Sequence, residues 1–298
     1  MGLKAGDRVL IEQTESGELV IRTDVRRGEE PRIKTLDISG LSPKQIERRV
    51  ISAYLSGFDE LRVTSKYRIL PGQREAVMNI LRRILGTEVL AETAHEMIIN
   101  DLLDFKEISP RSILRRMHVI VEFMLKNAVE AFFSGDEELA RDVIGRDEEV
   151  DKFYLLATRE VIEGIKRAGR ANIDLPPEKA VHYLSVARSL ERIADHSVRI
   201  SSMAGSPATK ELEEELRRLY SAVLENFEMA TRSFFSGDEK LADRVLDARE
   251  QVEQIISRIL HRIEDRPGSM GTFTLLDSFQ RVYAYSADIA ESTLDMNI

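Results

Sequence analysis

The chain has 298 residues, with 43 Lys and Arg against 52 Asp and Glu, and it contains no Cys. The missing Cys excludes disulfides, thiolate metal sites and a Cys nucleophile, so any metal must be held by carboxylates, by the five His or by backbone oxygens, which favour hard cations or iron. The net charge of −9 argues against a dedicated nucleic-acid binder, and the lack of an 18-residue apolar run argues against membrane insertion, so we expect a cytoplasmic protein.

The first 108 residues carry β signals. Residues 1–30 predict a β-hairpin, because two β-rich runs flank a turn at Glu15-Ser16-Gly17. Residues 31–108 alternate between strand and helix patterns and predict a small α/β domain. Its strands are expected at 32–38, 60–64, 87–90 and 97–99, and its helices from Ser42-Pro43 to Gly57 and over 72–85.

From residue 109 onward the pattern changes to long helices with little β signal. Ser109-Pro110 opens the first of them, and Gly135 followed by Asp136 separates the first from the second. The six expected helices cover 109–133, 136–168, 176–203, 208–235, 238–264 and 273–295.

An internal repeat organises this helical part. The hexapeptide Phe-Phe-Ser-Gly-Asp-Glu at 132–137 recurs at 234–239, and 11 of 20 positions are identical between 132–151 and 234–253. We therefore predict a duplication, with three helices in residues 109–205 and three in 206–298. The expected fold is mainly α, with two tandem three-helix bundles preceded by a β-hairpin and a small α/β domain.

Two acidic pairs in the first repeat are candidate metal ligands. Asp147 and Asp151 lie four residues apart on the second helix, and Glu191 and Asp195 lie four apart on the third. Residues at this spacing share one helix face, where like charges repel unless a cation or an Arg neutralises them. If the two helices are neighbours, the four carboxylates form one site that suits a hard cation or iron.

A less specific interpretation competes with this one. Acidic pairs at four-residue spacing arise by chance on solvated helix faces, and Arg146, Lys152 and Arg192 could neutralise them as surface ion pairs. The repeat provides an internal comparison, because the second copy keeps the scaffold but loses most of the carboxylates. The residues matching Asp147, Asp151, Glu191, Asp195 and His196 are Arg249, Glu253, Gln280, Ala284 and Tyr285. His196 and Glu253 are therefore only weaker metal candidates.

Together, the repeat and the acidic segments resemble the PhoU family of phosphate-uptake regulators. Asp147-x-x-x-Asp151 resembles the E(D)xxxD metal motif of that family, and Leu190–His196 (LERIADH) resembles the second instance of that motif. The resemblance covers about residues 109–298. It implies a cytoplasmic, metal-binding helical adaptor, usually a dimer or larger homo-oligomer, that contacts the phosphate ABC transporter or a signalling protein. Iron, zinc, magnesium and manganese all remain open as the metal.

The N-terminal part resembles the archaeal branch of the family, which carries an AbrB-like hairpin domain and an α/β linker. Leu3–Val9 resembles the second half of such a hairpin, so residues 1–30 are expected to be a partial AbrB-like segment. The first half, which would carry the DNA-binding side chains, is not in this sequence. DNA as a partner is therefore open but not favoured.

Three functions follow from these observations. The first is a metal-binding regulator of phosphate uptake that acts through protein–protein contacts. The second is a transcription regulator that binds DNA through its N-terminal hairpin. The third is a metal-dependent hydrolase or oxidase, but no nucleophile with an adjacent base supports catalysis, so we expect the chain not to be an enzyme.

Overall fold

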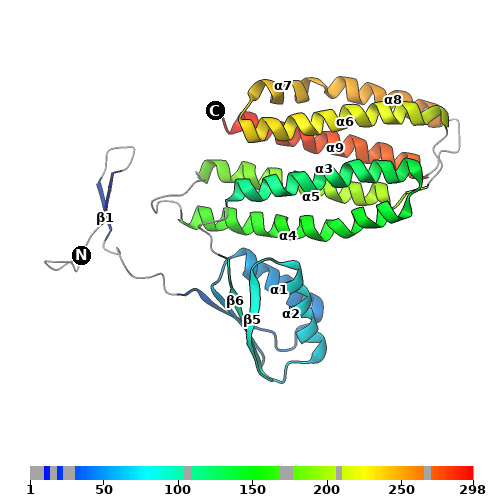
Figure 1. The fold of residues 1–298 in the computed structure, drawn as a ribbon. Coiled ribbons are helices and arrows are strands. Elements are labelled where there is room, and N and C mark those ends of the chain that lie inside the picture. Colours follow the sequence, from blue (N-terminus) through cyan, green and yellow to red (C-terminus); the bar gives the residue numbers. More distant parts are fainter. Residues whose placement is uncertain are drawn as a thin grey trace.

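The computed structural model describes residues 10–13, 19–22, 31–103, 109–167, 177–205, 210–264 and 270–297. It confirms the predicted mainly helical fold, with a hairpin and a small α/β domain before the long helices (Figure 1). The hairpin pairs β1 (Leu10–Gln13) with β2 (Leu19–Arg22) in antiparallel register. The other residues of the expected AbrB-like segment at 1–30 lie outside the described residues.

The α/β domain has a four-stranded sheet in the order β3-β4-β6-β5. Strands β3 and β4 are parallel, and helix α1 supplies the crossover between them, whereas the other neighbours are antiparallel. Helices α1 and α2 bury one apolar face, centred on Val50, Tyr54 and Ile80, with Val63 and Met97 of the sheet. The elements are β3 (Ile33–Asp37), α1 (Pro43–Leu55), β4 (Glu60–Thr64), α2 (Pro71–Arg83), β5 (Thr87–Glu92) and β6 (Glu96–Asp101).

Long helices form the rest of the structure and share one hydrophobic core (Figure 1). Helices α3, α4 and α5 pack against one another, α6 and α9 pack together with α7 and α8, and α5 packs against α9 to join the two repeats. The bounds are α3 (Pro110–Ser134), α4 (Glu137–Arg167), α5 (Pro177–Ser201), α6 (Lys210–Ser236), α7 (Glu239–Asp247), α8 (Arg249–Glu264) and α9 (Met270–Asp295).

The repeated hexapeptide forms the same helix–turn–helix in both copies. Gly135 and Gly237 follow α3 and α6 with φ of +73° and +70°, a left-handed conformation that favours glycine. Asp136 Oδ1 accepts the backbone N–H of Leu139 at 2.9 Å, and Asp238 Oδ1 accepts that of Leu241 at 3.2 Å. Both aspartates thus cap the helix that follows, as the sequence predicts.

The expected single helix over 238–264 is wrong, because α7 ends at Asp247 and α8 begins at Arg249. The buried Tyr283 hydroxyl of α9 donates to the Val245 carbonyl at 2.8 Å. In an unbroken helix that carbonyl would accept the N–H of residue 249. Where the short echo at 189–193 is aligned with 278–282, the first repeat has Ala194 in place of Tyr283, and α4 continues without a break.

Replacing Tyr283 with phenylalanine tests this explanation. The change frees the Val245 carbonyl for its helical partner but loses a buried hydrogen bond, so we expect the free energy of unfolding to fall by about 1 kcal/mol. Urea denaturation measures the loss, and amide hydrogen exchange at Arg249 should slow as its N–H gains an acceptor. Faster exchange at this position would contradict the explanation.

The α/β domain lies against α4 (Figure 1), and buried charges form the contact. Arg159 of α4 is fully buried, forms an ion pair with Asp101 at the end of β6, and lies over the ring of Tyr54 at 4.5 Å. Further along α4, Glu163 is also buried and pairs with Arg32 and Lys166. Because these charges are removed from water, each depends on its partner, which fixes the α/β domain on the first repeat.

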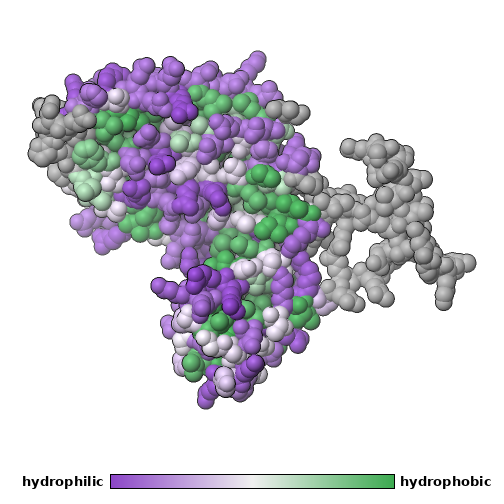
Figure 2. All heavy atoms as spheres, turned by 180° about the vertical axis from the view of Figure 1, so that it is seen from behind, coloured by the Kyte–Doolittle hydropathy of each residue, from purple (hydrophilic) through white to green (hydrophobic). Residues whose placement is uncertain are grey.

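Hydrophilic side chains cover much of the face of the molecule that Figure 2 shows. On the face opposite to that of Figure 1, hydrophobic side chains form separate patches among hydrophilic ones (Figure 2). Within the described ranges, no helix combines the length and the apolar character needed to cross a membrane.

Candidate metal centre

The structure brings the four predicted carboxylates together on two packed helices. Asp147 and Asp151 lie on α4, and Glu191 and Asp195 lie on α5, which packs along it. Each carboxylate borders a buried apolar residue, such as Val150, so the acidic faces run along the edge of the core. The helix spacing used in the sequence therefore places both pairs on the same side of the bundle.

The electrostatics show that the four groups act as one cluster. Burial raises the pKa of Asp147 to about 6, and the charges of Asp151 and Asp195 raise it as well. Burial also raises the pKa of Glu191, with the charges of Asp195, Asp151 and Asp147 acting in the same direction. The pKa of Asp195 is raised by burial and by Asp151, although Arg192 opposes the shift. Half-buried carboxylates that repel one another create a local demand for positive charge.

Two arginines meet part of this demand. Arg192 lies 3.2 Å from Asp195 and 3.4 Å from Glu191, as the competing interpretation of the sequence expects. Arg83 at the end of α2 lies 3.2 Å from Asp151. Arg83 carries no signal in the sequence that marks it as part of the site, because its contact with Asp151 depends on the docking of the α/β domain against α4, which no local pattern encodes. Asp147 forms no ion pair with any residue that the structure describes.

Arg146 and Lys152, the other two residues expected to neutralise the acidic pairs, do not form ion pairs with the four carboxylates. Arg146 pairs with Asp142 at 3.0 Å and covers the ring of Phe123 at 4.3 Å, so its charge is directed away from the cluster. Lys152 makes no ion pair within the described ranges.

The four side chains have the right chemistry to bind a cation, but their positions in this structure are not those of ligands around one ion. All four groups are carboxylates, the oxygen donors that hard cations and iron accept. In the described parts of the chain, however, no three His, Asp or Glu side chains have the mutual spacing of ligands around one ion. The side chains of Asp151 and Asp195 contact arginines instead. A metal at this site would replace these arginine contacts.

The weaker candidates are not part of the cluster. His196 is buried at the contact between α5 and α9, where its Nδ1 lies 3.2 Å from the Ser278 hydroxyl. Burial lowers the pKa of His196 to about 4, so its ring is neutral near pH 7. Glu253 lies on α8 of the second repeat and pairs with Arg249 at 2.9 Å. The residue that replaces Asp147 in the second repeat therefore neutralises the residue that replaces Asp151.

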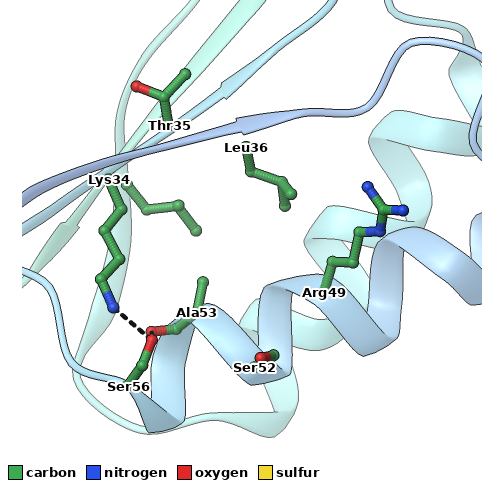
Figure 3. Close-up of a pocket in the computed structure, with 8 residues that line it drawn as sticks. Lys34, Thr35, Leu36, Arg49, Ser52, Ala53 and Ser56 are labelled. Carbon is green, nitrogen blue, oxygen red and sulfur yellow. Dashed lines mark hydrogen bonds between the residues drawn. The ribbon is translucent and has the colours of Figure 1, made fainter.

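A small hollow in the α/β domain is a second place where ligands could bind (Figure 3). It has a volume of about 330 Å³ and lies between β3 and α1, with Lys34 and Arg49 at its rim. The Lys34 ammonium donates to the Ser56 hydroxyl beside the end of α1, which places a cation at the negative end of the helix dipole. This contact gives Lys34 a structural role at the end of α1.

No observation on the described residues supports either of the alternative functions, DNA binding and metal-dependent catalysis. DNA binding depends on residues 1–30, of which only β1 and β2 are described. The Glu92–His95 spacing, which could suggest a metal motif, falls at the end of β5 and in the turn after it rather than on a helix.

Comparison with known proteins shows which proteins the helical region resembles. Residues 114–204 match the PhoU domain model. Curated relatives named phosphate-specific transport system accessory protein PhoU homologues include one from Caulobacter vibrioides, 33% identical over 90 residues, and one from Zymomonas mobilis, 26% identical over 186 residues. The Caulobacter match covers 30% of this chain and 37% of the relative, so the chain spans well under two thirds of that protein. The Zymomonas match covers 62% and 71%.

Solved structures show the same fold. PhoU from Pseudomonas aeruginosa has a TM-score of 0.51 at 21% identity, and the match covers 62% of this chain and 93% of that one. The phosphate transport system regulatory protein PhoU from Streptococcus pneumoniae has a TM-score of 0.54 at 18% identity, with 65% and 94% covered. The domain model and the relatives agree that the helical region resembles PhoU proteins, and the solved structures share its fold.

Proposed function

We propose that this protein is a metal-binding regulator of phosphate uptake that acts through protein–protein contacts. The observation that carries the proposal is the carboxylate cluster of the first repeat, on a bundle whose relatives are named accessory proteins of phosphate-specific transport. An accessory protein needs a shaped surface rather than a reaction centre, which agrees with the absence of a nucleophile–base pair from the sequence motifs. The dimer and the cytoplasmic location implied by the family resemblance belong to this proposal.

In this proposal, Asp147, Asp151, Glu191 and Asp195 hold the metal. The bound cation would neutralise the half-buried negative charge and hold α4 to α5. The family resemblance also suggests a His ligand and ligands in the second repeat. In this chain, however, His196 contacts Ser278 and Glu253 pairs with Arg249. We therefore propose that the first repeat alone carries the metal.

The partner is tested by affinity purification of the tagged full-length chain from phosphate-replete cells of its source. We expect a component of the phosphate transporter or of phosphate signalling to copurify, and we expect Asp151→Ala/Asp195→Ala to reduce its recovery. A matched control is Glu213→Ala/Glu214→Ala, which removes two carboxylates from exposed ion pairs on α6. Reproducible partners that include no phosphate-transport or phosphate-signalling component would contradict the proposal.

Arg83 provides a second test of the site. Because it pairs with Asp151 through an exposed contact worth up to about 1 kcal/mol, the Arg83→Ala variant should bind a divalent metal up to about fivefold more tightly. Titration with Mn²⁺ or Zn²⁺ measures the affinity. Arg82→Ala is the control, because Arg82 bonds Asn79 on its own helix instead of the cluster. Weaker metal binding by the Arg83→Ala variant would contradict the competition.

A further inference from the structure

A groove lies between α3 and α6, the first helices of the two repeats, whose side chains meet where Arg115 covers the Phe235 ring and Lys126 pairs with Glu228. Its volume is about 640 Å³, within the range of small-molecule sites. Six of its lining residues carry the inference: Arg115, His118 and Glu122 from α3, and Glu228, Arg232 and Phe235 from α6. The groove is separate from the carboxylate cluster, which lies on α4 and α5.

The two acidic residues of the groove share one cation of the protein. Lys126 lies 2.5 Å from Glu122 and 3.0 Å from Glu228, so one ammonium serves both carboxylates. Glu122 also lies 3.2 Å from His118 Nε2. These contacts offset part of the negative charge of the groove from within the protein, and the two positive charges of Arg115 and Arg232 exceed what remains.

The two arginines of the groove are not neutralised in this way. Within the part of the chain that the structure describes, neither Arg115 nor Arg232 forms an ion pair. The Arg115 guanidinium lies over the ring of Phe235 at 5.2 Å, which holds its position but leaves its charge and its N–H groups available. Two such guanidiniums at one groove, in a chain of net charge −9, form a local site for anions.

Comparison of the two repeats shows that the duplicated scaffold does not by itself require Arg115 and Arg232 in this form. Arg115 over Phe235 has a symmetric counterpart in Arg217 over Phe133, at 4.1 Å, because both pairs are related by the offset of 102 residues. Arg217, however, pairs with Glu213 at 2.9 Å.

The other groove positions differ as well. The residue matching Arg232 is Glu130, and those matching His118 and Glu122 are Tyr220 and Leu224. The duplicated scaffold thus carries the pair of available arginines on one side of its symmetry axis only.

We propose that this groove binds a small multivalent anion, a phosphate ester, an oligophosphate or a polycarboxylate, with Arg115 and Arg232 as the charge-bearing donors. Two guanidiniums can each engage a separate anionic group, and the volume accommodates more than a single inorganic phosphate. The Phe235 ring and the exposed Val119 provide an apolar wall for the rest of the molecule.

Isothermal titration calorimetry on the full-length, metal-free protein tests the proposal with pyrophosphate, ATP and citrate as probes. We expect saturable binding of at least one probe, and the choice among them separates the phosphate from the carboxylate source. Arg115→Gln/Arg232→Gln should weaken this binding by about tenfold or more. Both side chains are exposed, so the variant should fold, which circular dichroism verifies.

The symmetric side of the bundle provides the controls. Arg217→Gln removes the counterpart of Arg115 and should leave the dissociation constant within about twofold of wild type, because Arg217 is already paired. Arg232→Glu, which introduces the residue that the first repeat carries at this position, should weaken binding at least as much as the double variant. Saturable binding of none of the probes, or equal weakening by Arg217→Gln, would overturn the proposal.

Discussion

Replacing Arg159 with alanine is expected to lower the free energy of unfolding by about 3–5 kcal/mol. The guanidinium is fully buried and pairs with Asp101, whose side chain is only 2% exposed. Burial raises the pKa of Asp101, the charge of Asp59 acts in the same direction, and the Arg159 charge opposes the shift. Without the guanidinium, the carboxylate is left buried and uncompensated at the contact between the α/β domain and α4. Chemical denaturation of the wild type and the variant measures the difference.

Two further variants separate the buried charge from a general loss of contacts. Arg159→Met/Asp101→Asn removes both charges, keeps much of the volume and leaves an oxygen for the Leu103 N–H, which Asp101 now accepts at 3.2 Å. This double variant should recover most of the loss, because the cost comes from an unpaired charge. Arg192→Ala removes an exposed arginine and should cost less than about 1 kcal/mol. A loss below that level for Arg159→Ala would contradict the account of the domain contact.

Metal is expected to stabilise the wild type and to leave Asp151→Ala/Asp195→Ala unaffected. A ligand that binds only the folded state at about one hundred times its dissociation constant adds about 2.7 kcal/mol to the free energy of unfolding. The double variant removes one carboxylate from each helix of the cluster, so this gain should disappear. Thermal or urea unfolding with and without Mn²⁺ or Zn²⁺ gives both values.

The metal-free forms provide the internal control for that experiment. Asp151 and Asp195 are each paired with an arginine at a partly exposed position, so the pairs contribute little, and removing the like charges relieves repulsion. The metal-free double variant should therefore unfold within about 1 kcal/mol of the metal-free wild type. A much larger loss would show that the carboxylates have a structural role instead.

Much of the fold could be predicted because its signals are local. Gly135 followed by Asp136 ends one helix and caps the next, and the repeated hexapeptide does the same at Gly237. The acidic pairs could be placed together because the four-residue spacing fixes the helix face and the short connections of a bundle make α4 and α5 neighbours.

The contacts that escaped prediction join segments that are distant in the chain. The break at Ala248 depends on the Tyr283 hydroxyl of α9, and the ion pair of Asp151 depends on Arg83 of α2. The residue type alone would predict an exposed Arg159, because an arginine is rarely buried without a partner. The structure instead buries it completely. None of these contacts has a periodic pattern, because each results from tertiary docking.

The metal content of the purified protein tests the central proposal most directly. Elemental analysis of the full-length wild type should show bound metal, and Asp151→Ala/Asp195→Ala should retain little of it. Glu213→Ala/Glu214→Ala, which removes the same charge from α6, should keep the wild-type content. Equal metal content in the wild type and in the Asp151→Ala/Asp195→Ala variant would contradict the assignment of Asp147, Asp151, Glu191 and Asp195 as the metal site.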